Sequence, residues 1–102
     1  MADKNIGAAQ GITFEIKPEV EGGVYSNVAS IVHNVNEFIL DFAIIVPGKE
    51  AAPVRSRVIT SPAHAKQFLA ALQENIAGYE RSFGEIKTGA SMPVVKSTQS
   101  VH

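Results

Sequence analysis

The stretch Glu37-Phe-Ile-Leu-Asp-Phe-Ala-Ile-Ile-Val46 decides the fold of this chain. One set of alternate positions is entirely apolar and consists of Phe38, Leu40, Phe42, Ile44 and Val46. Successive side chains of a β-strand point to opposite faces of a sheet, so this spacing predicts a strand with one core face. The other positions mix aliphatic and charged side chains, namely Glu37, Ile39, Asp41, Ala43 and Ile45. The second face of this strand is therefore unlike an ordinary solvated surface.

Three more strands are predicted around this one. Residues 12–17 alternate strictly between apolar and polar side chains, which is typical of a half-buried strand. Residues 24–33 are rich in β-branched side chains, although they alternate less regularly. Residues 54–60 form the fourth predicted strand, after a loop that opens with a Pro-Gly pair.

A long helix is predicted after the last strand. Ser61 can accept a hydrogen bond from a free backbone N–H at the helix start, and Pro62 fits the first helical position. The helix is expected to stop at Gly84. Its apolar stripe, at spacings of three and four, consists of Ala65, Phe68, Leu69, Leu72, Ile76, Tyr79 and Phe83. Burial of this stripe contributes on the order of 10 kcal/mol before any opposing entropy is counted.

These elements predict an α+β fold with the order β-β-β-β-α. We expect an antiparallel four-stranded meander followed by one long helix that packs on one sheet face. Residues 12–87 form a single domain in this interpretation. Residues 1–11 are small and polar and are predicted to be a disordered N-terminal arm, and residues 88–102 a flexible C-terminal tail.

The composition excludes several classes of protein. The 102 residues include no cysteine, so a disulfide framework, a zinc ribbon and a thiol nucleophile are excluded. No apolar run approaches the roughly 20 residues that span a bilayer. The first residues lack the pattern of a secretory signal, so we expect a soluble, cytoplasmic protein with no membrane partner.

The charged residues are distributed unevenly along the chain. Residues 1–50 hold three lysines and seven acidic residues, a net charge of −4, whereas residues 51–102 hold six basic and three acidic residues, a net charge of +3. Such halves can attract each other within one chain or between two copies. The acidic pI of about 6.3 argues against nucleic acid as a partner.

The half-aliphatic, half-charged sheet face predicts self-association. In an antiparallel hairpin Arg57 lies directly or diagonally across from Asp41, and such pairs help to fix strand register. The predicted oligomer interface consists of Ile39, Asp41, Ala43, Ile45, Arg55, Arg57 and Ile59. We therefore expect a homo-oligomer, a dimer or a dimer of dimers, formed through this face or through a strand edge.

No convincing catalytic, metal-binding or cofactor-binding cluster is found in the sequence. His33, Asp41 and His64 could form a site shared between subunits, but no second histidine lies at ligand spacing from His33. His33 is better explained as a turn residue, and Ser61 beside His64 as a helix cap. The glycines match no phosphate-binding or dinucleotide-binding pattern.

Four motifs, in order, resemble a known family. They are Tyr25-Ser-Asn27, Glu37-Phe-Ile-Leu-Asp-Phe42, Ser61-Pro-Ala-His-Ala-Lys66 and Leu72-Gln-Glu-Asn-Ile-Ala-Gly-Tyr-Glu-Arg-Ser-Phe-Gly-Glu-Ile86. Over residues 12–87 the chain resembles domain-of-unknown-function family 3467, small uncharacterised bacterial and archaeal proteins. The resemblance implies a domain of strands followed by one helix, and no activity. At the level of topology alone, the chain is also similar to the SecB-like export chaperones.

We therefore expect a small homo-oligomeric binding or assembly module, not an enzyme, that binds peptide or protein segments as SecB-like proteins do. Two alternatives remain open at this point. One is a nucleic-acid-associated regulator in which Arg55, Arg57 and Lys66 of two subunits form a basic patch. The other is a small enzyme or ligand-binding protein with a site between subunits.

Overall fold

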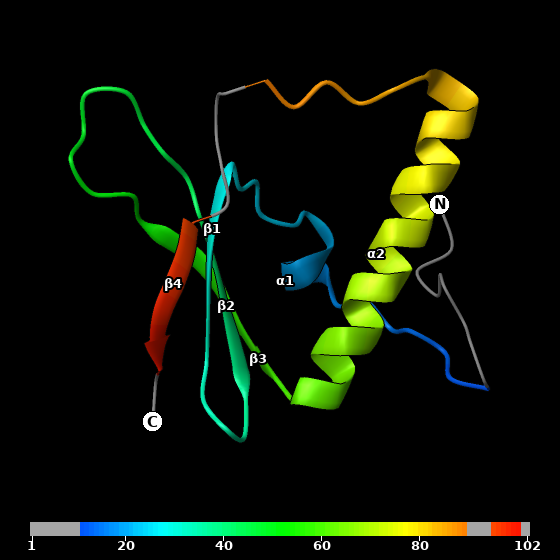
Figure 1. Cartoon of the computed structure of the whole chain (residues 1–102), viewed down its shortest axis with the longest axis horizontal. Helices are drawn as coiled ribbons and strands as arrows, with labels where there is room; N and C mark the ends of the chain where they lie inside the picture. Colours follow the sequence, from blue (N-terminus) through cyan, green and yellow to red (C-terminus); the bar gives the residue numbers. More distant parts are fainter. Residues whose placement is uncertain (1–10, 90–94, 101–102) are drawn as a thin grey trace.

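The protein is described by a computed structural model over residues 11–89 and 95–100. Its elements are α1 (Pro18–Glu21), β1 (Val28–His33), β2 (Phe38–Ala43), β3 (Val54–Thr60), α2 (Pro62–Phe83) and β4 (Val95–Ser100) (Figure 1). The sheet has the order β3-β2-β1-β4. Strands β1, β2 and β3 pair antiparallel, and β4 pairs parallel with β1. The α+β class, an antiparallel three-stranded sheet and a long helix are thus confirmed.

The predicted strand over residues 12–17 is wrong. Apart from an isolated bridge at Ile12 the segment has no strand pairing, and it leads into the short helix α1 at Pro18. Alternation favours a strand only where a neighbouring strand supplies hydrogen bonds, and the place beside β1 belongs to β4. Ile12 and Phe14 are exposed as a result. The β-β-β-β-α meander therefore lacks its first strand.

The predicted terminal segments lie partly outside the described residues. The structure does not describe residues 1–10 of the predicted arm, nor residues 90–94 and 101–102 of the predicted tail. Strand β4 falls within the segment predicted as a C-terminal tail.

The register of the sheet follows from local side-chain chemistry. The Oδ1 atom of Asn34 accepts hydrogen bonds from the backbone N–H groups of Asn36 and Glu37, at 2.8 and 2.9 Å, in the turn between β1 and β2. Asp41 lies directly across from Arg57, which is one of the two predicted placements, direct or diagonal. Phe42 pairs with Ser56 and Ala43 with Val54, so Arg55 is the extra residue of a β-bulge.

This register gives the sheet two different faces. We call one the aromatic face, defined by Ala29, Ile31, His33, Phe38, Leu40, Phe42, Ser56, Val58 and Thr60. We call the other the Asp41 face, defined by Val28, Ser30, Val32, Ile39, Asp41, Ala43, Arg57 and Ile59. Among the described residues the buried hydrophobic side chains are Ala29, Ile39 and Ala43, so the core lies inside the strands and is small.

Helix α2 begins and ends where the sequence predicts. Ser61 caps it by accepting a hydrogen bond from the backbone N–H of His64 at 3.1 Å. At the other end Gly84 has a φ of 97°, which a glycine adopts without strain, and its N–H bonds to the carbonyl of Glu80. Both ends of the helix are thus set by local chemistry.

The predicted packing of α2 on a sheet face is wrong for the single chain. None of the side chains described in α2 is buried. Figure 1 shows α2 beside the sheet, with its N-terminal end close to β3. The physical reason is the connection: only Ser61 separates Thr60, the last residue of β3, from Pro62, the first of α2. Such a joint is too short to reverse the chain direction over the sheet.

Candidate functional site

An apolar stripe on α2 is left uncovered in the described chain. Its large side chains Phe68, Leu69, Leu72, Ile76, Tyr79 and Phe83 are all exposed. Leu72 keeps 45% of its surface exposed, and Phe83 keeps 75%. The rings of Tyr79 and Phe83 contact each other at a centroid distance of 5.0 Å. A stripe of this size on a helix is normally buried, and exposed apolar patches mark interaction surfaces.

The first turns of α2 form a notch with the aromatic face. A cavity of about 360 Å³ lies there, lined mainly by Leu40, Phe42, Val58, His64 and Phe68. The start of α2 and the sheet therefore line this cavity together, and the rest of the stripe continues past it. Both sides of this notch are apolar, which suits an aliphatic or aromatic side chain from another segment.

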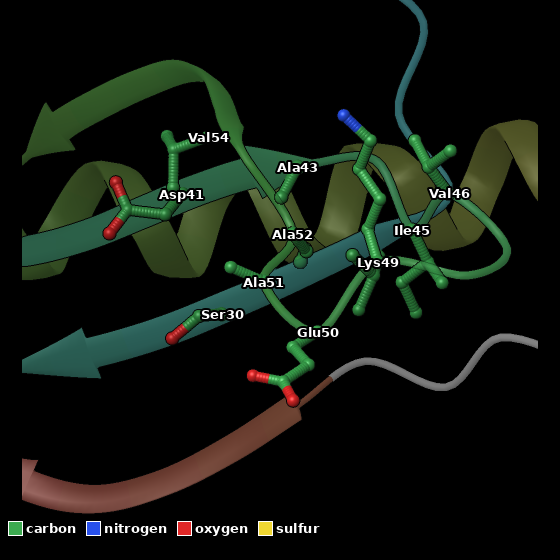
Figure 2. A pocket seen from close by; sticks show the side chains of 12 residues that line it. Ser30, Asp41, Ala43, Ile45, Val46, Lys49, Glu50, Ala51, Ala52 and Val54 are labelled. Carbon is green, nitrogen blue, oxygen red and sulfur yellow. The ribbon is translucent and has the colours of Figure 1, made fainter.

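The opposite side of the sheet holds a second hollow. Figure 2 shows Ser30 and Asp41 on the strands and Ala51 and Ala52 on the returning β2–β3 loop around the same pocket. The pocket measures about 390 Å³, and Ala43, Ile45, Val46 and Val54 complete its apolar lining. Lys49 and Glu50 add one charge of each sign. An extended segment with apolar side chains fits such a lining.

The β2–β3 loop is held in place by Asn27 and Ser26. The backbone N–H of Ile45 donates to Oδ1 of Asn27 at 2.7 Å, and Nδ2 of Asn27 donates back to the carbonyl of Ile45 at 3.3 Å. The Ser26 hydroxyl bonds to the carbonyl of Ala43 at 2.8 Å. These bonds fix the start of the loop, so one wall of the pocket is preorganised.

Asp41 and Arg57 form a two-point ion pair on the Asp41 face. Nε of Arg57 donates to one carboxylate oxygen at 2.7 Å, and Nη2 donates to the other at 2.8 Å. These hydrogen bonds, together with the positive charge of Arg57, lower the pKa of Asp41. The same contacts raise the pKa of Arg57. The pair links β2 to β3 and neutralises both charges.

The predicted interface residues share one side of the sheet. Five of them belong to the Asp41 face, and Ile45 lines the pocket beside it. Arg55 is the bulged residue of β3. Ile39 and Ala43 are only 4% and 7% exposed, so they already serve the core of the single chain. Whether the remaining residues form an interface stays a prediction.

The two histidines and Asp41 are not brought together in the single chain. His33 stacks on Phe38 at a centroid distance of 5.3 Å, on the aromatic face. His64 lines the notch on that same side, whereas Asp41 belongs to the opposite face. In the part of the chain that the structure describes, no group of three histidine or acidic side chains could hold a metal ion.

The three cations of the predicted basic patch have different surroundings. Arg57 is bonded to Asp41, and Arg55 sits in the bulge of β3. Lys66 lies on α2, away from the apolar stripe. A phosphate group would have to compete with the Asp41 carboxylate for Arg57.

Sequence reasoning missed the exposure of the α2 stripe and the pocket under the β2–β3 loop. The first could have been found from the single residue between the predicted strand end and helix start. The second depends on Asn27, whose side chain reaches a residue 18 positions away. No local pattern signals such a contact.

Comparison with known proteins gives one match. The model of a family described as "Protein of unknown function (DUF3467)" matches residues 1–88. No curated protein and no solved structure matches the chain. The similarity to SecB-like chaperones is therefore not confirmed. Within the described residues, no helix is long and apolar enough to cross a membrane.

Proposed function

We propose that this chain, which belongs to the DUF3467 family of proteins of unknown function, is a homo-oligomeric module that acts by binding protein segments. The observation that carries the proposal is the uncovered apolar stripe of α2. Small single domains have thin cores and often gain stability from a second copy. Here the described core is limited to two alanines and one isoleucine, whereas six large side chains on α2 remain exposed.

Energetics favour covering this stripe. Full burial of a large apolar side chain contributes about 1.5–3 kcal/mol, and roughly half of each stripe side chain is still exposed. Association through the stripe would therefore add several kcal/mol to a chain whose own core is small. Native domains are stable by only about 5–15 kcal/mol, so this gain is a large part of the total.

Association through the faces is favoured over pairing of β3 edges. Strand β3 is at the free edge of the sheet, but it carries the Arg55 bulge and the exposed Arg57. Bulges and charges on an edge strand oppose further strand pairing. The other flank of β1 is occupied by β4.

The partner site of the module is the pocket on the Asp41 face. Its aliphatic lining takes apolar side chains of an extended segment, and Lys49 and Glu50 at its border pair with charges on that segment. Hydrogen bonds already hold the start of the β2–β3 loop in place, so less conformational entropy is lost when a segment binds. This pocket lies on the side of the sheet away from the notch, so both can be used at once.

Sedimentation velocity at protein concentrations in the tens of micromolar tests the oligomer. We expect the wild type to sediment as a dimer or larger species. Leu72→Asp should weaken association about a hundredfold or more, because each copy loses a buried leucine and gains a buried charge. Ala70→Asp places the same charge on the polar side of α2 and should leave association unchanged. A monomeric wild type would overturn the proposal.

Binding of protein segments is tested on an array of overlapping decapeptides from a denatured protein of known sequence. We expect the wild type to retain peptides that combine aliphatic and charged residues. Ala52→Trp should abolish retention because the indole fills the pocket, whereas Ala70→Trp on α2 should not. Equal retention by both variants would remove the pocket from the proposal.

A further inference from the structure

We infer that α2 is exchanged between two copies. The apolar stripe of each copy covers the aromatic face of the other copy. The inference rests on the proposed self-association and adds which surfaces meet. Each helix would stay attached to its own sheet by the notch and reach across with the stripe beyond it. Such a reciprocal contact has two-fold symmetry.

The connection between β3 and α2 prevents the helix from covering its own sheet. Ser61 is extended, with φ −76° and ψ 157°, and its side chain is bonded to the first helical turn. Pro62 restricts the joint further. Strand-to-helix connections usually need two to six residues, and here there is one. A short, rigid connection of this kind is the usual origin of exchanged elements.

The amount of exposed surface matches a permanent dimer. The chain exposes 8516 Å², whereas a compact protein of its mass exposes about 5,600 Å². The excess is about 2,900 Å² per chain, or about 5,800 Å² for two copies, and permanent dimers bury roughly 2,000–5,000 Å² over both copies. On the aromatic face Ile31 is 38% exposed and Val58 is 45% exposed. The face and the stripe therefore both have area left to bury.

The absence of native cysteine allows the exchange to be mapped with disulfides. Ile31→Cys places a thiol on the aromatic face, directly across from Leu40 of the neighbouring strand, and Ile76→Cys places one on the stripe about two helical turns beyond Phe68 of the notch. An equimolar mixture of the two single variants is oxidised mildly, and the disulfide-linked peptides are identified by mass spectrometry. Ala70→Cys replaces Ile76→Cys in the control mixture, because it lies on the opposite side of α2.

We expect the first mixture to form about ten times more mixed disulfide than the control, since a disulfide requires Cα atoms within roughly 7 Å. No excess over the control, with the wild type sedimenting as a dimer, would overturn the exchange and leave the self-association standing. A disulfide that forms only within a chain carrying both substitutions would also overturn it. A monomeric wild type would remove both claims.

Discussion

At the scale of single residues, the contacts that the sequence specifies locally are the ones that the structure contains. Asp41 and Arg57 are predicted to lie directly or diagonally across from each other if their strands form an antiparallel hairpin, and they meet at 2.7 Å. Ser61 was identified as a helix cap by residue type, and it accepts the expected bond. The Ser61 contact is fixed by a spacing of three residues, whereas the Asp41–Arg57 pair follows from the antiparallel pairing of β2 with β3.

The Asp41–Arg57 pair makes stability depend on pH. The pKa of Asp41 is lowered in the folded chain from an ordinary value of 3.8. Its contribution is therefore complete above that value and is lost as the pH falls through the folded pKa. We expect Asp41→Asn to lower the free energy of unfolding at pH 7, and the difference from the wild type to shrink below about pH 4. Urea unfolding of both proteins at several pH values measures this difference in free energy of unfolding.

The control for this pair is Arg55→Gln, which removes a nearby cation from the bulge of β3. The loss in free energy of unfolding caused by Arg55→Gln should be the same at pH 7 and at acidic pH. The loss caused by Asp41→Asn should differ between these two pH values. A pH-independent difference for Asp41→Asn would contradict the ion pair.

The cap at Ser61 should be measurable in the stability of α2. We expect Ser61→Ala to lower the free energy of unfolding by about 1 kcal/mol, because the backbone N–H of His64 loses its acceptor. Ser82→Ala removes a hydroxyl near the other end of α2 and serves as the control. Urea unfolding followed by circular dichroism at the helix band compares them. Equal losses for the two variants would show that capping contributes nothing.

At the scale of elements, periodicity predicted where elements lie better than how they pack. Strand β3 and helix α2 have the predicted bounds, since their patterns coincide with strong end signals. Residues 12–17 show equally good alternation and yet form no strand. Pairing depends on a neighbour elsewhere in the chain, which no local pattern contains.

Lengthening the joint before α2 tests why the helix leaves its sheet. We expect a Gly-Ser-Gly-Asn insertion between Thr60 and Ser61 to let α2 fold back on its own aromatic face, because the reversal then has room and the cap is kept. Light scattering after gel filtration should show a shift from oligomer to monomer. The same insertion after Gly48, in the β2–β3 loop, should leave the oligomer intact. An unchanged molar mass for the first variant would argue against the role of the joint.

At the scale of the whole molecule, the candidate site could be predicted only in part. The sequence predicts self-association, from a sheet face that mixes aliphatic and charged side chains and from oppositely charged halves. It placed the surface on the Asp41 face, where Ile39 and Ala43 prove to be buried within the chain. The exposed stripe of α2 was assigned to an internal core instead. To predict that the stripe is exposed, one needs the three-dimensional path of the chain after Thr60, and residue types do not specify that path.

An oligomer that completes the core should unfold in a concentration-dependent way. We expect the melting temperature of the wild type to rise by roughly 5–10 °C over a hundredfold increase in protein concentration, since association stabilises only the folded chain. Leu72→Asp should melt at a temperature that does not depend on concentration. Thermal unfolding is followed by circular dichroism, and cells of different path length allow measurement over the hundredfold range of protein concentration. A constant melting temperature for the wild type would contradict an obligatory oligomer.

The central claim is that the α2 stripe of one copy is covered by a second copy. Its most direct test is an isotope-filtered nuclear Overhauser experiment on a mixture of carbon-13-labelled and unlabelled wild-type chains, which detects contacts between chains only. The account predicts cross-peaks between the methyl groups of Leu72 and Ile76 in one chain and the rings of Phe38 and Phe42 in the other. A filtered spectrum in which these methyl groups give no cross-peak to a ring of the other chain would contradict it.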